Sequence, residues 1–257
     1  MDRTDSANTI QTLDIELSVP FGIQINQAAG SLFHGVLMEN IDSDYADFLH
    51  SQSVRPYSQY LRFDAKSHTL HWRITALNAQ ASRELLQPLI ELPGHIYLRH
   101  KHLQLDIKAQ RLSDKLPYKQ MAQKYFDDSA PVRGIVKYTF LTSAGFKSSG
   151  EYLIFPAPPL IFNSLLRRFN AFSQTDFLDR KGIAGTLERE VEIADYNLHY
   201  SPFSVEGRKI PAFKGSYALK ISKNIMARRI IAMLSEYAAY CGIGIKTSLG
   251  MGAVKVE

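Results

Sequence analysis

The order of its hydrophobic patterns constrains this chain more than any other feature of its sequence. A half-buried strand carries apolar residues at every second position, whereas an amphipathic helix carries them at spacings of three and four. By these criteria the first half contains, in order, a strand at 9–19, helices at 26–39 and 43–50, strands at 59–64 and 68–75, a helix at 80–91 and a long strand at 95–109. This order is β-α-β-β-α-β, the ferredoxin-like unit.

A second series of segments repeats this pattern with additions. It comprises strands at 134–142 and 151–155, a helix beginning at Pro158-Pro159, strands at 187–198 and 216–222, a helix at 224–240 and a strand at 253–256. We therefore predict an α+β fold of two tandem ferredoxin-like (RRM-like) domains with a C-terminal glycine-rich loop. The predicted domains are 1–112 and 134–257, and the polar stretch 113–133, which two prolines interrupt, is the predicted linker.

The composition narrows the class of protein. Hydrophobic residues make up 45% and charged residues 21% of the 257, which excludes a fully disordered chain. The single cysteine, Cys241, excludes an internal disulfide framework and a cysteine-cluster zinc site, and it favours the reducing cytoplasm. The most apolar stretch, 152–162, is too short to span a bilayer. We expect a cytoplasmic protein without a membrane segment.

Charge is distributed unevenly along the chain. Residues 1–54 carry a net charge of −7, so the remainder carries +12. Residues 207–229 contain seven Lys and Arg side chains, among them Arg208 and Lys209, and no acid. A dense segment of one sign suits a polyanion such as nucleic acid. A solvated surface hairpin is the alternative explanation.

The glycine-rich loop near the C-terminus is the most specific motif. It joins a predicted helix to a predicted strand, and its residues of interest are Gly242, Gly244, Lys246, Thr247, Ser248, Gly250 and Gly252. Glycines allow positive φ and close approach of a ligand, and successive exposed amides can cradle phosphates. A Rossmann loop does not fit, because it runs from strand to helix, and a P-loop does not fit, because Ile245 precedes Lys246. The alternative is a helix C-cap followed by a glycine-containing hairpin.

The loop GIGIKTSLGMGAVKVE resembles the C-terminal signature of the CRISPR repeat-processing endoribonucleases of the RAMP superfamily. Further segments resemble the same family in the same order along the chain. They are Phe33-His34-Gly35, Leu49-His50, Arg55-Pro56-Tyr57-Ser58 and the stretch IFNSLLRRFN at 161–170. The resemblance implies tandem ferredoxin-like domains and metal-independent cleavage of CRISPR precursor RNA within the repeat. In that reaction the 2′-OH attacks the adjacent phosphate and leaves a 2′,3′-cyclic phosphate and a 5′-OH.

Such a cleavage needs a base, an acid and a cation for the charge that develops on the phosphate. His50 matches the family's catalytic histidine and is the candidate base or acid. His34, on the first helix, is the second candidate, with a structural histidine as the alternative. Some relatives place a tyrosine one turn after His34, where this chain has Met38. Arg55 is the candidate phosphate cation.

Other basic residues are candidates for holding the RNA. Lys246 would bind backbone at the glycine loop, together with that loop's glycines, Thr247 and Ser248. Arg167 and Arg168 are expected on the polar side of their helix, where they either grip the repeat or are simply solvated. His100 and His102 share a face of the predicted strand 95–109, but no nearby carboxylate or thiol completes a metal site. We therefore expect no metal and no cofactor.

Three functions fit these observations. The first is the repeat endoribonuclease, whose partner is CRISPR repeat RNA. The second is a catalytically inactive RNA-binding RAMP subunit of a CRISPR effector complex, which Met38 keeps open. The third is an unrelated α+β metabolic enzyme with a fortuitous loop. Other CRISPR effector subunits and a second copy of this chain, in a homodimer, are further candidate partners.

Overall fold

The computed structural model describes residues 8–127, 132–174, 180–205 and 207–257. The first domain contains, in chain order, β1 (Thr9–Ser18), α1 (Gly30–Glu39), α2 (Ser43–Ser51), β2 (Tyr57–Asp64), β3 (Thr69–Ala76), the helical stretch α3 (Ala79–Ala81), η2 (Ser82–Leu86) and α4 (Gln87–Ile90), then β4 (His95–Leu98) and β5 (Leu103–Leu112). Its sheet has the order β2-β3-β1-β5-β4, and β1 is antiparallel to both of its long neighbours. Without β4, this is the strand order of a ferredoxin-like domain, as the sequence predicts.

Apolar and acidic residues alternate along β1, and this alternation determines which face of the sheet the helices cover. Leu13, Ile15 and Leu17 are completely buried, whereas the intervening acidic residues are half-buried on the other face. Asp14 pairs there with Arg73, its register partner on β3, at 2.6 Å. The apolar face carries α1, so the charged face is left open on the side away from that helix.

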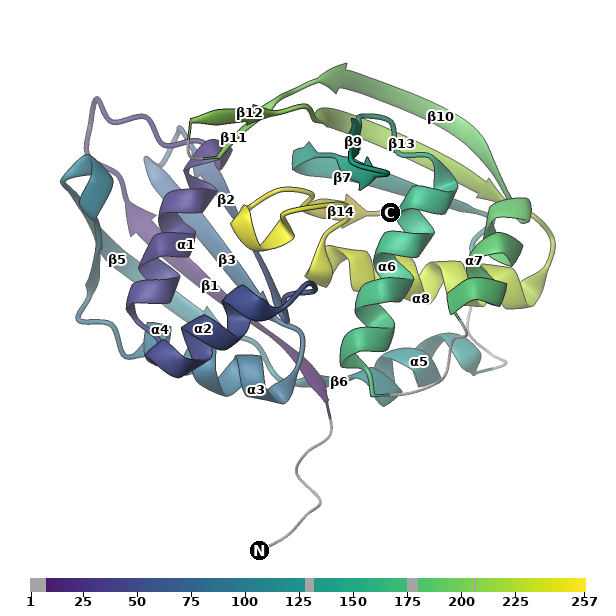
Figure 1. Ribbon diagram of the computed structural model, residues 1–257, viewed down its shortest axis with the longest axis horizontal. Coiled ribbons are helices and arrows are strands. Elements are labelled where there is room, and N and C mark those ends of the chain that lie inside the picture. Colours follow the sequence, from purple (N-terminus) through teal and green to yellow (C-terminus); the bar gives the residue numbers. More distant parts are fainter. Residues whose placement is uncertain (1–7, 128–131, 175–179, 206) are drawn as a thin grey trace, which may run out of the picture.

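The second domain repeats the arrangement with insertions. It contains β7 (Ile135–Ala144), β8 (Phe146–Ser148), β9 (Glu151–Leu153), α6 (Pro158–Phe172), α7 (Arg180–Arg189), β10 (Val191–Tyr200), β11 (Phe203–Val205), β12 (Arg208–Ile210), β13 (Phe213–Ile221), α8 (Ile225–Cys241), a 3-10 turn η4 (Thr247–Leu249) and β14 (Val254–Val256). The sheet order is β10-β13-β7-β14, again that of a ferredoxin-like domain. The tandem α+β architecture predicted from the sequence is therefore confirmed (Figure 1).

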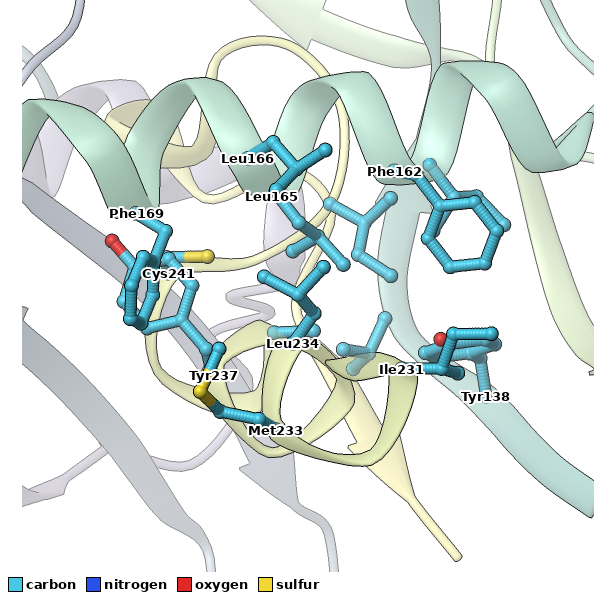
Figure 2. Close-up of a cluster of buried hydrophobic side chains, with 14 of the residues drawn as sticks. Tyr138, Phe162, Leu165, Leu166, Phe169, Ile231, Met233, Leu234, Tyr237 and Cys241 are labelled. Atoms are coloured by element: carbon cyan, nitrogen blue, oxygen red, sulfur yellow. The ribbon is translucent and has the colours of Figure 1, made fainter. Parts of the chain in front are cut away.

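Each domain has its own apolar core. In the second domain, α6 and α8 pack against each other through buried side chains that include Phe162, Leu165, Phe169, Leu234 and Tyr237 (Figure 2). In the first, Phe33 of α1 meets Trp72 of β3 edge to face, with ring centroids 4.9 Å apart. Helix α1 is thereby held firmly on its sheet.

The structure corrects several expectations. The single strand predicted at 95–109 is a hairpin of β4 and β5, because the chain turns through η3 (Arg99–Lys101) and a left-handed His102. The interpretation that His100 and His102 share a strand face is thus wrong. Helix α7 and the strands β11 and β12 have no counterpart among the predicted helices and strands. Within the strand predicted at 151–155, only Glu151–Leu153 forms a strand, β9, and it pairs with β8 in a short hairpin instead of joining the main sheet.

The stretch expected as a polar linker is largely folded. It contains β6 (Leu116–Pro117), which pairs with β1, and α5 (Tyr118–Phe126), which buries Tyr118 and Met121 in the core of the second domain. Pro117 is the last residue of β6 and the N-cap of α5. This polar stretch was mistaken for a linker because α5 is a short amphipathic helix. Residues 128–131 of this stretch lie outside the described residues. None of the helices in the described ranges is long and apolar enough to cross a membrane.

Candidate active site

The glycine-rich loop lies between the two domains (Figure 1). Helix α8 ends at Cys241, and the loop returns through η4 to β14. Its turn is seated against α1 and β2 of the first domain. Gln59 of β2 donates to the Ser248 carbonyl at 2.7 Å and accepts a hydrogen bond from Trp72 at 2.7 Å. A Cβ on Gly30 would lie 2.1 Å from the Leu249 carbonyl oxygen, so only glycine permits this close contact.

The glycines of the loop stabilise its own conformation. All four have positive φ, and Gly242 caps α8. Their amides donate within the protein, from Gly242 to the Ala238 carbonyl, from Gly244 to Ser164 Oγ, from Gly250 to the Thr247 carbonyl and from Gly252 to the Ser143 carbonyl. The expected cradle of exposed glycine amides is therefore wrong. Of the alternative interpretation, the helix C-cap at Gly242 is confirmed, whereas a 3-10 turn takes the place of the expected hairpin.

Arg168 is buried beneath this loop, with a residual exposure of 6%. Its guanidinium donates to the Cys241 carbonyl at 2.8 Å and to the Gly244 carbonyl at 3.1 Å, and it also donates to Thr247 Oγ1. The expectation that Arg168 lies on the polar side of α6 is wrong. Ile161, Leu165 and Phe172, which lie seven, three and four positions away on the same face of the helix, are also buried. Helical periodicity therefore indicates a buried position for Arg168.

Three candidate catalytic side chains from separate segments meet beside the loop. His34 projects from α1, His50 from the last turn of α2, and Arg55 from the segment before β2. The two imidazole rings have centroids 6.4 Å apart. Arg55 Nη1 donates to Ser248 Oγ at 3.5 Å, which links this group to the loop. The structure thus brings together all three residues that the sequence nominates for catalysis.

The local structure explains the exposure of His50. Asp42 caps α2 by accepting hydrogen bonds from the amides of Asp44 and Tyr45. Tyr45 and Leu49 form the buried face of the helix, so His50 points away from the core and is exposed. An exposed imidazole at this position is open to a substrate.

His34 has a different environment. Its Nδ1 lies 2.9 Å from the Tyr57 hydroxyl, and the two rings are nearly parallel. Burial, together with the neighbouring Arg55 and His50, lowers the pKa of His34 to about 4. Burial likewise raises the pKa of Tyr57 to about 12. Near neutral pH the pair is therefore a neutral imidazole beside a neutral phenol.

Tyr57 and Gln59 were not nominated from the sequence. Tyr57 belongs to a quoted motif, but nothing in the sequence shows that its hydroxyl reaches a residue 23 positions earlier. Gln59 lies two positions after Tyr57, on the same face of β2, and is almost completely buried. A glutamine on the apolar face of a strand is the only sequence signal for this contact, since a buried amide must find partners.

The candidate RNA-binding residues are dispersed. Lys246 is exposed at the tip of the loop with a left-handed φ of 52°, whereas Thr247 and Ser248 are buried. Arg208 and Lys209 are exposed on β12, whose hairpin packs on the loop through the cluster of Phe203 and Met251. Arg167 is exposed on α6. Of these basic side chains, Lys246 belongs to the loop that contacts the catalytic candidates.

A separate cleft of about 1210 Å³ lies on the open face of the first sheet, against α8 and β14. Its lining includes Arg62, Arg73 and Arg111 as well as Asp14 and Glu16. None of the nominated catalytic or RNA-binding residues lines it. Among the described residues there is no group of three or more His, Cys, Asp or Glu side chains that could hold a metal ion.

Comparison with known proteins identifies what this arrangement resembles. Residues 138–254 match the family model of the CRISPR-associated endoribonuclease Cas6. The chain is 31% identical to a Mycobacterium tuberculosis protein of that name over 96% of this chain and 77% of that protein. It is also 31% identical to the Streptococcus thermophilus protein, over 88% and 90% of the two chains. A Cas6 product complex shares the fold with a TM-score of 0.77 at 21% identity, covering 97% and 99% of the chains.

Proposed function

The chain belongs to the family of CRISPR-associated Cas6 endoribonucleases, and on that premise we propose that it cleaves CRISPR precursor RNA within its repeats without a metal ion. The attacking group is the RNA's own 2′-OH. Its oxygen forms a bond to the adjacent phosphorus while the bond from phosphorus to the 5′-oxygen breaks. A base takes the 2′-OH proton, and an acid gives a proton to the departing 5′-oxygen. The products are a 2′,3′-cyclic phosphate and a 5′-OH.

One observation carries this proposal, the meeting of His34, His50 and Arg55 at the glycine loop. Imidazole is the side chain most often used for proton transfer in catalysis, and the exposure of His50 leaves its ring open to the RNA. Arg55 supplies fixed positive charge for the oxygens of the phosphorane. These side chains come from α1, α2 and the segment before β2, so the fold is needed to assemble them.

The remaining basic residues suit the RNA backbone. We assign Lys246, Arg167, Arg208 and Lys209 to phosphate contacts, because each is exposed. Arg168 is excluded from this role by its burial. For each phosphate neutralised, the logarithm of RNA affinity should fall by about 0.7–0.9 per logarithmic unit of salt.

The decisive experiment incubates the purified protein with repeat RNA in EDTA and identifies the product ends. A matched RNA carries a 2′-deoxy substitution at the cleavage position. We expect a cyclic phosphate product, and no cleavage of the deoxy RNA. A requirement for added metal would reject the mechanism. Tight binding without any product would instead identify a catalytically inactive RNA-binding subunit.

The cellular setting follows from the same premise. We place the protein in the cytoplasm, bound to repeat RNA before cleavage and to mature crRNA afterwards. Other CRISPR effector subunits and a second copy of the chain are candidate partners. Sedimentation of the purified protein with and without repeat RNA would measure the oligomeric state directly.

A further inference from the structure

Tyr57 stands directly behind one of the proposed catalytic groups. It lies at the start of β2 with no residual exposure, and its hydroxyl is 2.9 Å from His34 Nδ1. The positive charge of Arg55 acts on this phenol and lowers its pKa, against the effect of burial, and Arg55 Nη1 donates to Ser248 Oγ at 3.5 Å. These four side chains therefore form a small cluster that joins α1, β2 and the glycine loop.

The direction of each hydrogen bond follows from the available protons. The guanidinium of Arg55 carries a fixed positive charge, so it favours a phenol whose oxygen lone pairs face Arg55 and whose proton points away from it. Ser248 Oγ accepts a hydrogen bond from the same guanidinium. The phenol has a single proton, and His34 Nδ1 is the acceptor within reach. This arrangement favours donation from Tyr57 to Nδ1, which places the imidazole proton on Nε2.

We propose that Tyr57 is a positioning residue that holds His34 as the neutral tautomer protonated on Nε2, so that His34 donates a hydrogen bond to the scissile phosphate and does not transfer a proton. This inference rests on the proposed ribonuclease function. With Nδ1 occupied by Tyr57 and Nε2 already protonated, His34 has no lone pair with which to deprotonate the 2′-OH. His50 is left as the histidine that moves the proton.

The surrounding charges favour the neutral form of His34. Arg55 and His50 face the ring from the segment before β2 and from α2, and both oppose a second positive charge. At the C-terminal end of α1, Glu39 forms an ion pair with Arg99 at 3.3 Å. Protonation at Nδ1 would also require the Tyr57 hydroxyl to turn its proton towards the positive charge of Arg55.

The tautomer can be measured without substrate. Long-range ¹H–¹⁵N spectra of histidine-labelled protein distinguish Nδ1–H, Nε2–H and doubly protonated rings, and His34→Gln assigns the signal. We expect His34 to remain in the Nε2–H form from about pH 5 to 8, since its pKa is lowered to about 4. In Tyr57→Phe the fixed donor is lost, and we expect a mixture of tautomers. An Nδ1–H ring in the wild-type protein would overturn the proposal.

Cleavage under single-turnover conditions tests the role in the reaction. Loss of one fixed donor to a developing oxyanion costs about 100-fold or more in rate, which is the loss we expect for His34→Ala. His34→Gln keeps an N–H near the Nε2 position, so it should recover at least tenfold over alanine and show a pH–rate profile of wild-type shape. Tyr57→Phe should slow cleavage about tenfold with unchanged RNA affinity.

A matched control is Tyr45→Phe. It removes a buried hydroxyl that has no hydrogen-bond partner among the described residues, from the helix that carries His50. Its cleavage rate should equal that of the wild type. A glutamine variant as inactive as alanine would show that His34 transfers a proton, and the inference would fall. If the wild-type protein cleaves no repeat RNA, the proposed function fails, whereas the spectra still decide the tautomer.

Discussion

Replacing Arg168 by methionine should destabilise the protein, although a basic residue on an RNA-binding protein is usually changed to weaken RNA binding. The side chain is 6% exposed and its guanidinium donates to two carbonyls and one hydroxyl of the glycine loop. Methionine fills similar space but donates nothing. The cost is therefore set by acceptors left without partners in a buried site.

The magnitude follows from the number of those acceptors. A buried polar group that loses its partner costs about 1–3 kcal/mol, and a hydrogen bond from a charged donor is at the upper end of that range. Methionine avoids the cost of burying a guanidinium, which offsets part of the loss. We expect Arg168→Met to reduce the free energy of unfolding by about 3–5 kcal/mol.

The neighbouring residue gives a matched control. Arg167 is exposed, so Arg167→Met should reduce the free energy of unfolding by much less than Arg168→Met does. It should instead weaken RNA binding and lower the salt slope by about 0.7–0.9, the value for one phosphate. Urea unfolding and RNA titrations at several salt concentrations measure both effects. If Arg168→Met keeps wild-type stability and weakens only RNA binding, the assignment of Arg168 to the loop is refuted.

Three further perturbations test other parts of the site. His50→Ala should abolish cleavage of repeat RNA while leaving its affinity unchanged, and retained cleavage would remove His50 from the proposed mechanism. Gly30→Ala should destabilise the fold by about 1–3 kcal/mol, because its Cβ would lie 2.1 Å from the Leu249 carbonyl, whereas Gly35→Ala, with open space around the new Cβ, should be neutral or stabilising in urea unfolding. Because the pKa of His34 falls to about 4 on folding, the unfolded chain binds more protons below its own pKa, so stability should decrease as pH falls from about 6.5 to 4. His34→Gln should reduce that slope, and an unchanged slope would contradict the burial of a neutral His34.

The tandem fold follows from patterns that are local in the chain. Alternation along β1 and the stripe on α1 each need only a short window of sequence. The same reasoning fails where a turn is made by a residue with no turn signature. His102 takes a left-handed conformation between β4 and β5, and histidine is not the residue expected there. The predicted strand therefore ran through the turn.

The catalytic candidates came from the resemblance and not from periodicity. His34, His50 and Arg55 lie on separate elements, and no local pattern predicts that they meet. The prediction that Arg168 is exposed was wrong for the opposite reason. It gave more weight to the charge of the side chain than to its position on the buried face of α6. The role of Tyr57 could not be predicted from the sequence, because the partner of its hydroxyl depends on how α1 packs on the sheet.

Because the glycine loop packs on the first domain, the site is completed only after the C-terminal end of the chain has been synthesised. The hydrogen bonds from Arg55 and Gln59 to Ser248 join residues 193 and 189 positions apart. At a synthesis rate of about 5–20 residues per second, the loop emerges from the ribosome roughly 10–40 s after the segment it completes. During that interval α1 and β2 can fold, but Arg55 and Gln59 lack Ser248. A nascent chain that already carries every nominated catalytic side chain therefore has an unfinished site.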